Sequence, residues 1–333
     1  MSTSAGNIDV SVIVLNYNGH QWLEGCLTAT LQQIDERGEL ILVDNASTDR
    51  SVDLVRTAFP TVRVVALDQN FGFARGNNMG ARTARGRYIA FLNNDTIPQP
   101  GWLSALKAPF DHDPSTALAT SRIVYLDDPS VVDSAGDGYL RAGGAFKRFH
   151  GAPSAAAGDP GEVFGACGAA CMFRKDAFLD LGGFDEDFFM IYEDVDISYR
   201  ARLRGHKCTY VPGAIVHHAG SASLHRNSAM SVFYGQRNLE WTYLKNTPWP
   251  LLIRSLPNHV LYDSAGLFAY GTRGLLGPYL KGKWAALKGL PGILRKRSQI
   301  QKRRVTSAQE LWAAMDGNWI RRKRVEKRFD FRP

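Results

Sequence analysis

The chain has 333 residues, of which 44% are hydrophobic and 22% charged, and it carries a formal net charge of +8. This composition is typical of a globular protein with a sizeable core, and it excludes a disordered or low-complexity chain. The charge is uneven, because residues 241–333 hold 19 Lys and Arg against 5 Asp and Glu, whereas residues 1–240 hold 21 against 27.

Strands and helices alternate through the first hundred residues. Apolar runs predict buried strands at 10–15, 39–43, 62–67 and 88–92, and helical spacing predicts a helix at 22–33. A second helix is expected to run to Phe59, with Ser47 or Thr48 as its N-cap and Asp49 in its first turn. Residues 70–79 read as a Gly- and Asn-rich loop that leads into a helix. The alternation indicates an α/β domain with a mainly parallel sheet.

The following residues are less regular. Residues 111–160 are rich in Asp, Gly, Pro and Ala, which predicts long loops with short strands. After them we expect a strand at 170–174, helices at 176–181 and 194–203, and a pair of strands at 208–211 and 214–218.

Polar residues stand where three of the early strands end. They are Asn16-Tyr17-Asn18, Asp44-Asn45 and Asn93-Asn94-Asp95. Because parallel sheets place ligands beyond the carboxyl ends of their strands, these residues are expected to meet in one crevice. No GxGxxG follows the first strand and no GxxxxGK[ST] occurs, which disfavours a dinucleotide-dependent dehydrogenase and a P-loop protein.

Three carboxylates follow an apolar run in FFMIYEDVDISYRARLRG, residues 188–205. Glu193, Asp194 and Asp196 are costly to bury unless each is paired or bound to a ligand. On a helix Asp196 faces away from Asp194, and we expect it to pair with Arg200 four residues later.

The four cysteines are Cys26, Cys167, Cys171 and Cys208, and no CxxC pair occurs. We expect reduced, structural thiols, because no second pair of zinc ligands stands near Cys167 and Cys171. No secretory signal opens the chain and no run of 18 apolar residues occurs, so no membrane-spanning helix is expected.

With these residues in view, the chain resembles the family 2 glycosyltransferases, and within them the bacterial rhamnosyltransferase-like members. The resemblance extends from about Val10 to Ser223 and depends on the order of VSVIVLNYNG, ILVDNASTDRS, NFGFARGNNMG, FLNNDT, GGFDEDFFMIYEDVDISYRARLRG and YVPGAIVHH. It implies a Rossmann-like glycosyltransferase-A fold with helices on both faces of the sheet, a nucleotide-sugar donor, Mg²⁺ or Mn²⁺, and inversion at the anomeric carbon.

For the donor, the resemblance implies that Asp44 accepts a hydrogen bond from the pyrimidine ring. Asn16, Asn18 and Asn94 are further candidates from the strand ends, and Arg75 and Asn77 are candidates from the Gly-rich segment. Asp44 could instead cap a helix, and Arg75 could be a solvated loop charge.

For the metal, Asp95 matches the acidic end of the family's DxD motif, and a histidine after YVPGAIV matches a second ligand. Strand register favours His218 over His217, because neighbouring residues point to opposite faces. Asn93 stands where the family has its first acidic residue, so the site has one charge less.

For catalysis, the resemblance implies that Asp194 is the general base that deprotonates the acceptor hydroxyl. Glu193 would orient the acceptor or a neighbouring loop. The apolar residues before them are expected to raise the pKa of Asp194 by desolvation, which suits a base.

Residues 241–333 are read as a basic, amphipathic helical appendage to a catalytic domain of residues 1–240, with a nucleotide-binding half at about 8–110 and an acceptor half at about 111–240. Leu, Trp and Tyr mixed with Lys and Arg are typical of helices on an anionic membrane surface. The appendage could equally pack on the catalytic domain or on the second subunit of a homodimer. Pro248, Pro250, Pro257, Pro278 and Pro291 are expected to divide it into short helices, and no module for nucleic acid accompanies it.

The sequence therefore predicts an inverting transferase that uses dTDP-L-rhamnose, or alternatively a UDP-hexose or UDP-galactofuranose. Its acceptor would be a surface polysaccharide or a lipid-linked glycan, at the cytoplasmic face of the cell membrane. A non-catalytic nucleotide-sugar-binding or scaffolding protein is the alternative of another class, favoured only by Asn93. A nucleotidyltransferase ranks lower, because NYNG lacks the Lys or Arg expected after the first strand.

Overall fold

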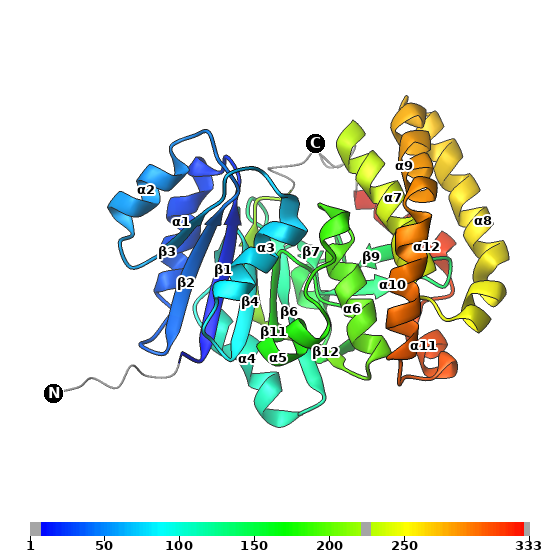
Figure 1. Cartoon of the computed structure of the whole chain (residues 1–333). Coiled ribbons are helices and arrows are strands. Elements are labelled where there is room, and N and C mark those ends of the chain that lie inside the picture. Colours follow the sequence, from blue (N-terminus) through cyan, green and yellow to red (C-terminus); the bar gives the residue numbers. More distant parts are fainter. Residues whose placement is uncertain (1–7, 221–227, 330–333) are drawn as a thin grey trace.

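A computed structural model describes residues 8–220 and 228–329, so the last residues of the matched stretch, 221–223, lie outside it (Figure 1). Its centre is a ten-stranded sheet of order β10-β12-β6-β11-β4-β1-β2-β3, to which β5 adds beside β12 and β7 beside β6. The strands are β1 Val10–Asn16, β2 Gly38–Asp44, β3 Arg63–Ala66, β4 Tyr88–Asn93, β5 Thr96–Pro98, β6 Thr116–Tyr125, β7 Val132–Ser134, β10 Gly161–Val163, β11 Ala170–Arg174 and β12 Lys207–His218. Strands β8 Asp137–Tyr139 and β9 Ala145–Lys147 form a separate hairpin.

The half that was predicted to bind the nucleotide, residues 8–110, contains a parallel sheet of β3, β2, β1 and β4, as expected. Alternate residues of β1 enter different cores, Val12 and Val14 on one face and Ile13 on the other. Both faces are covered by helices, which explains the uninterrupted apolar runs. One face packs on α1 His20–Leu31, α2 Ser51–Ala58 and α4 Trp102–His112, and the other on α3 Gly72–Thr83, α5 Lys175–Asp180 and α6 Glu193–Leu203.

Two local predictions in this half were wrong. Helix α2 begins at Ser51 with Arg50 as its N-cap residue, so Asp49 precedes the helix and accepts a hydrogen bond from the Ser51 backbone N–H. Ser47 is occupied elsewhere, because its hydroxyl bonds to Asp44. Most of the expected loop at 70–79 is helical, because α3 starts at Gly72, whose φ of 78° allows the abrupt start.

The acceptor half is a mixed sheet. Strand β6 is ten residues long, where loops with short strands were predicted, and it lies between β12 and β11. The two strands expected at 208–211 and 214–218 are one strand, β12, with an irregularity between Val211 and Ile215. Between the two expected strands β12 only bulges, and its pairing with β6 resumes at Ile215.

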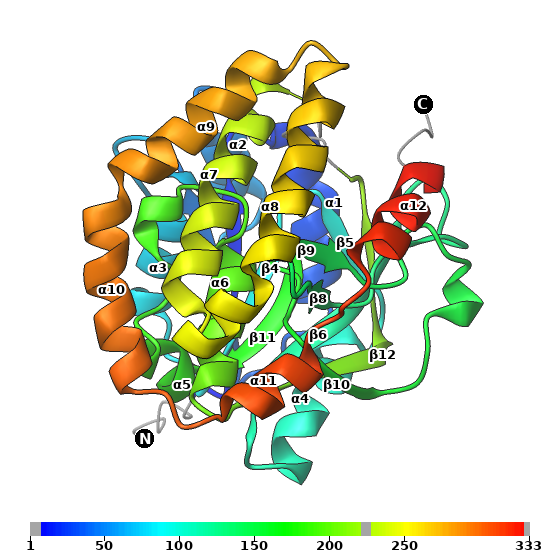
Figure 2. The same ribbon diagram turned by 90° about the vertical axis from the view of Figure 1, so that its right-hand side faces the viewer.

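Six helices form the C-terminal region: α7 Ala229–Asn246, α8 Trp249–Gly271, α9 Leu276–Lys288, α10 Leu290–Lys302, α11 Ala308–Ala314 and α12 Trp319–Phe329 (Figures 1 and 2). Pro250 and Pro291 stand in the first turns of α8 and α10, where a missing N–H costs nothing. Pro257 lies inside α8, so the prediction that every proline divides the region was wrong. Among the described residues, no helix combines the length and the hydropathy that a bilayer crossing requires.

The structure has the expected architecture, an α/β sheet with helices on both faces and a helical C-terminal region. Helix α7 runs through residue 240, where the sequence suggested that the catalytic domain ends. All four cysteines are buried and free, and burial raises the pKa of the Cys26 thiol to about 12. A thiol in this environment stays protonated and unreactive at neutral pH.

Candidate active site

Hydrogen bonds join the carboxyl ends of β1, β2 and β4. Asn16 lies opposite Asp44 in the register of the two strands, and its Nδ2 donates to Asp44 Oδ1 at 3.0 Å. Asn94 Nδ2 donates to Asn16 Oδ1 at 2.7 Å. Asp44 also accepts from the backbone N–H of Ser47 at 2.9 Å, which fixes the loop after β2. All three side chains are buried, and their hydrogen bonds join the ends of the three strands.

Asp95 and His218 lie next to each other. His218 Nε2 is 3.3 Å from Asp95 Oδ1, and both side chains are more than nine-tenths buried. Strand β12 brings them together, because His218 pairs with Thr96 on β5, directly after Asp95. His217 lies on the opposite face of β12, which is the geometry that its register predicts.

Asp133 on β7 orients His218. Its Oδ2 is 2.9 Å from His218 Nδ1, and its carboxylate also accepts from Lys147 Nζ at 2.7 Å. Burial alone would lower the pKa of His218, but the neighbouring carboxylates of Asp133 and Asp95 raise it to about 9. His218 is therefore a cation between two carboxylates at neutral pH, with Nε2 directed toward Asp95.

These residues fit a divalent cation. Asp95 Oδ1 is buried without a hydrogen-bond partner among the described residues, and its neighbour His218 Nε2 becomes a ligand when deprotonated. A hard carboxylate oxygen and an imidazole nitrogen suit Mn²⁺, and the carboxylate suits Mg²⁺. Asp133 supplies the second carboxylate that metal-binding histidines commonly have behind them.

Asp194 stands at the start of α6, after a strained turn. Phe189, Ile191 and Tyr192 have positive φ angles of 63°, 66° and 76°, which non-glycine residues rarely adopt. Asn238 of α7, fully buried, donates from its amide to the carbonyls of Phe188, Met190 and Ile191 at 2.7–3.0 Å. The sequence FFMIY thus forms a clamped turn that fixes the start of α6.

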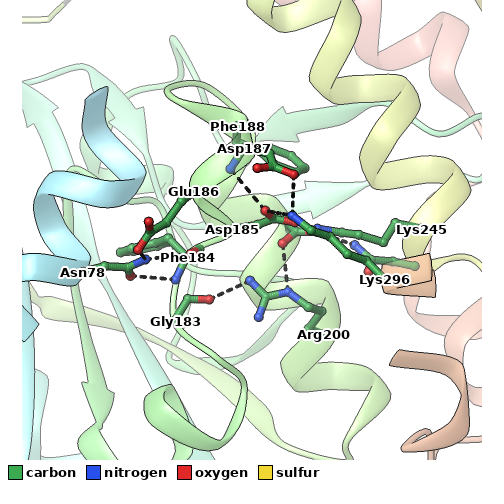
Figure 3. A network of polar contacts seen from close by, with 12 residues as sticks. Asn78, Gly183, Phe184, Asp185, Glu186, Asp187, Phe188, Arg200, Lys245 and Lys296 are labelled. Carbon is green, nitrogen blue, oxygen red and sulfur yellow. Dashed lines mark hydrogen bonds and ion pairs between the residues drawn. The ribbon is translucent and has the colours of Figure 1, made fainter. Parts of the chain in front are cut away.

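A network of buried charges holds the chain just before this turn (Figure 3). Lys245 of α7 forms ion pairs with Asp185 and, at 2.8 Å, with Asp196 Oδ1. Arg200 bonds to Asp196 Oδ2 at 2.8 Å, the pairing that the sequence predicted. Lys296 of α10 reaches Asp185 from the side nearer to solvent. The catalytic sheet and the C-terminal helices therefore share one polar core.

The Asp194 carboxylate is fixed by two backbone N–H groups, those of Gly168 and Val195, both at 2.8 Å. Burial raises its pKa above the ordinary carboxyl value, although these hydrogen bonds oppose the shift. The pKa of Glu193 is also raised, by burial and by Asp194, and its Oε2 has no partner among the described residues. Asp194 is the stronger candidate for a base, because two N–H donors fix its carboxylate.

Asp194 and His218 face a common cavity of about 500 Å³. Asp194, Glu193 and His218 all line it, so the proton acceptor and the metal-ligand candidate face one space. Its other lining residues are Phe73, Asn93, Asp137, Ala145, Phe146, Lys147, His150, Cys167, Gly168, Ala169, Met190, Ile191, Tyr192 and Val195.

Asp137, Cys167 and Asp194 each offer a ligand atom within 4.8 Å of the others. Burial raises the pKa of the Cys167 thiol, which disfavours the thiolate that a metal would need. Burial and Asp194 also raise the pKa of Asp137. Both shifts favour protonated groups, which disfavours this cluster as a cation site.

None of the six predicted donor residues lines this cavity: three belong to the network at the strand ends, and the other three lie elsewhere. Arg75 stacks on Phe71 at 4.1 Å and lies 3.6 Å from Glu186, on the surface of α3. Asn77 is buried within α3, where its amide donates to the Phe73 carbonyl, so it cannot reach a donor in this conformation. Asn18 is exposed and accepts a hydrogen bond from the backbone of Thr48.

Sequence reasoning missed Asp133, Asp137 and Asn238. The two aspartates stand in the segment read as loops, and their neighbours in the site come from distant strands and helices. Asn238 lies on a helix with no motif around it. Only a buried strand pattern at 116–125 could have indicated that the segment enters the sheet.

We predict that Asp133→Asn weakens Mn²⁺ binding by roughly 10–100-fold, because the charge that orients His218 is lost. Calorimetric titration of the purified protein with Mn²⁺ alone measures this. Asp127→Asn, an exposed neighbour, is the matched control and should leave the affinity unchanged. An unchanged affinity in folded Asp133→Asn protein would show that Asp133 does not support a metal site.

Comparisons with known proteins identify the family and confirm the glycosyltransferase-A type α/β fold. The model of the family described as "Glycosyl transferase family 2" matches residues 11–182. The uncharacterized protein MT1568 of Mycobacterium tuberculosis is 29% identical over 249 residues, which are 70% of this chain and 75% of that protein. The poly-beta-1,6-N-acetyl-D-glucosamine synthase of Staphylococcus aureus is 26% identical over 209 residues, 62% of this chain, and the chain spans about half of it, 48%.

Among solved structures, the mannosyltransferase PcManGT from Pyrobaculum calidifontis, in complex with GDP-Man and Mn²⁺, is similar with a TM-score of 0.52. The match covers 88% of this chain and 84% of that one at 20% identity, so it supports the fold alone. The family match covers more than half of the chain and includes the ends of β1, β2 and β4. The chain therefore belongs to glycosyl transferase family 2.

Proposed function

We propose that this protein is an inverting glycosyltransferase that moves a sugar from a nucleotide-diphosphate sugar to a hydroxyl of a glycan. The observation that carries the proposal is the cavity that Asp194 and His218 line together, with Asp95 behind His218. Transfer with inversion needs a proton acceptor on one side of the anomeric carbon and a stabilised diphosphate on the other.

In the reaction, the acceptor hydroxyl attacks the anomeric carbon while the bond to the diphosphate breaks. Asp194 takes the hydroxyl proton, because its carboxylate is fixed by Gly168 and Val195 and its raised pKa makes it a stronger base. Asp95 and His218 would hold Mg²⁺ or Mn²⁺, which when bound neutralises charge on the leaving diphosphate. Mn²⁺ in the mannosyltransferase that shares this fold supports this choice.

The donor that we propose is dTDP-L-rhamnose, with a UDP-hexose or UDP-galactofuranose as the alternative. The support is the rhamnosyltransferase-like motif order, and Asp44 at the place of the pyrimidine contact. We further propose a cell-surface polysaccharide or a lipid-linked glycan as acceptor, and a cytoplasmic, peripheral position on the inner face of the cell membrane. The basic composition of residues 241–333 supports that position.

A thermal-shift screen of the purified protein with Mn²⁺ and each of dTDP-rhamnose, UDP-glucose, UDP-galactofuranose and GDP-mannose tests the donor. A ligand at about 100 times its Kd stabilises the folded state by roughly 2.7 kcal/mol, which raises the midpoint by several degrees. We expect the dTDP-sugar to give the largest shift, and the shift to fall in Asp44→Asn. A larger shift with GDP-mannose would overturn the pyrimidine assignment.

The alternative is a protein that binds the nucleotide sugar without turning it over. Asn93 in place of an acidic residue is the one feature that favours it. Release of nucleoside diphosphate from the preferred donor separates the two, because a binder would show the thermal shift and no release.

A further inference from the structure

The outward faces of α8 and α9 are apolar. Along α8 the exposed residues Trp249, Ile253, Leu256, Val260 and Leu267 recur every three, four or seven positions, which places them on one line of the helix. Ile253 is 73% exposed and the neighbouring Phe268 75%. The exposed apolar residues of these two helices, here called the apolar surface, are Trp249, Ile253, Leu256, Val260, Leu261, Leu267, Phe268, Leu276, Leu280, Trp284 and Leu287. Soluble monomers rarely expose so many large apolar side chains together.

The two helices contribute to one continuous surface. They are packed side by side, with an ion pair between Asp263 and Lys283 and a hydrogen bond of 2.9 Å from Tyr279 Oη to the Asp263 carbonyl. Helical spacing places both apolar stripes next to this contact, on the side away from the core. Both helices lie in front of the rest of the molecule in Figure 2.

Positive charge borders the apolar surface. Residues 249–302 hold nine Lys and Arg and a single acidic residue, Asp263, which is paired with Lys283. Lys281 and Lys288 are exposed at the edge of the α9 stripe. The other exposed cations of this stretch are Arg254, Arg273, Arg295 and Lys302. Apolar stripes edged by cations are typical of helices that lie in the interface of an anionic bilayer.

This charge also disfavours a second copy of the chain as the partner. A symmetric dimer through the apolar surface would bring Lys281 and Lys288 of each copy near the same cations of the other. No exposed acidic residue stands on α8, α9 or α10 to compensate them. Anionic lipid headgroups supply the missing counter-charge.

The inner face of α8 packs on the wall of the cavity. His259 Nδ1 is 2.8 Å from the Ala142 carbonyl, and a Cβ on Gly144 would come within 2.5 Å of Tyr262 Oη. The next residues, Ala145 and Phe146, line the cavity, and Tyr262 packs against Phe146. One helix, about 10–12 Å across, therefore separates the apolar surface from the cavity wall.

We propose that the apolar surface docks on an anionic lipid membrane and that the acceptor enters the cavity from this membrane as a lipid-linked glycan. The evidence for docking is the exposed apolar side chains and the cations that border them. The origin of the acceptor rests on the proposed function, and it follows because docking through α8 holds the neighbouring cavity close to the lipid headgroups.

Flotation of the full chain with vesicles tests the docking. We expect binding to vesicles of equal parts phosphatidylglycerol and phosphatidylcholine, and little to phosphatidylcholine alone. Binding should weaken in 1 M salt, where the Debye length falls from about 10 Å to about 3 Å. The triple variant Ile253→Gln/Leu280→Gln/Trp284→Gln and the double variant Lys281→Glu/Lys288→Glu should each lose roughly tenfold or more in partitioning.

The matched controls are Leu179→Gln/Val305→Gln, which changes two exposed apolar residues elsewhere, and Arg56→Glu on α2. Both should bind like the wild type. Wild-type protein that floats with neither vesicle, or controls that lose as much binding as the test variants, would overturn the docking. So would a wild-type dimer in sedimentation that the triple variant converts to monomer without any vesicle binding.

The acceptor's origin is tested with the same triple variant. We expect its release of nucleotide from the donor in water to stay within about twofold of wild type, and its transfer to a polyprenyl-diphosphate sugar held in vesicles to fall roughly tenfold. Equal transfer to that acceptor by the wild type and the triple variant would overturn the proposal that the acceptor comes from the membrane. If the wild type turned over no donor at all, the proposed function would fail, whereas flotation would still decide the docking.

Discussion

Replacing Asp194 by Asn should lower kcat for sugar transfer by about 10²–10⁴-fold while leaving donor binding intact. Asn has the same size, and its one oxygen can keep a single hydrogen bond from Gly168 or Val195, but it cannot accept a proton. The affinity for the donor should not change, because Asp95, His218 and the strand-end network are untouched. Initial rates with saturating donor and acceptor measure the first quantity, and calorimetric titration with the nucleoside diphosphate measures the second.

Glu193→Gln is the matched control for this experiment. Burial and Asp194 raise the pKa of Glu193, which favours its neutral form, and Gln has the size of that form. Its kcat should stay within about tenfold of wild type. If Glu193→Gln lost as much activity as Asp194→Asn, or if Asp194→Asn kept wild-type turnover, Asp194 would not be the base.

The pH dependence of kcat/KM should also reflect the ionisation of Asp194. Because burial raises the pKa of Asp194, the ionised form that accepts the proton is populated only above the ordinary carboxyl range. The acid limb of kcat/KM should therefore lie above pH about 4 and disappear in the residual activity of Asp194→Asn. The raised pKa also means that the folded protein binds this proton more tightly than the unfolded chain, so this group's contribution to stability falls as pH rises through the interval between the two pKa values.

The strand ends show what the sequence could predict. The β-branched runs of β1, β2 and β4 are buried on both faces, so their positions and their polar ends could be predicted without coordinates. Asp44, Asp95, Asp194 and His218 were predicted from motif order. The structure places Asp95 beside His218, and Asp194 and His218 in one cavity. The sequence could predict these positions because each residue lies at the end of a strand or at the start of a helix, next to the apolar run that predicts that element.

The missed residues depend on contacts between distant parts of the chain. Asp133 acts on His218, 85 residues away, and the pairing of β6 with β12 that brings them together has no local signature. Asn238 holds a turn that lies 47–50 residues earlier. The prediction that Pro257 ends a helix was wrong for a similar reason. Helix α8 is held by contacts of His259 and Ser255 on its inner face, while Pro257 itself is exposed. Tertiary contacts outweighed the helix-breaking tendency of proline at that point.

The largest expected effect on stability also comes from contacts between distant parts of the chain, the ion pairs of Lys245 with Asp185 and Asp196. Lys245→Met should lower the free energy of unfolding by about 3 kcal/mol, because it removes the buried cation that Asp185 and Asp196 share and leaves each carboxylate with one cationic partner. Lys245 is 1% exposed and is the one cation that contacts both carboxylates among the described residues (Figure 3). Urea unfolding followed by circular dichroism measures the change.

Lys296→Met is the matched control, since Lys296 pairs with Asp185 too but its side chain is 35% exposed. Its cost should be about 1 kcal/mol or less. Although burial opposes it, Lys245 and Lys296 hold the pKa of Asp185 well below its usual range, so the stability that this carboxylate contributes is present above pH about 4 and is lost as pH falls toward the folded-state pKa. The difference between Lys245→Met and wild type should accordingly shrink in acid. Equal costs for the two lysine variants at pH 7 would mean that this buried network does not join the C-terminal helices to the catalytic sheet.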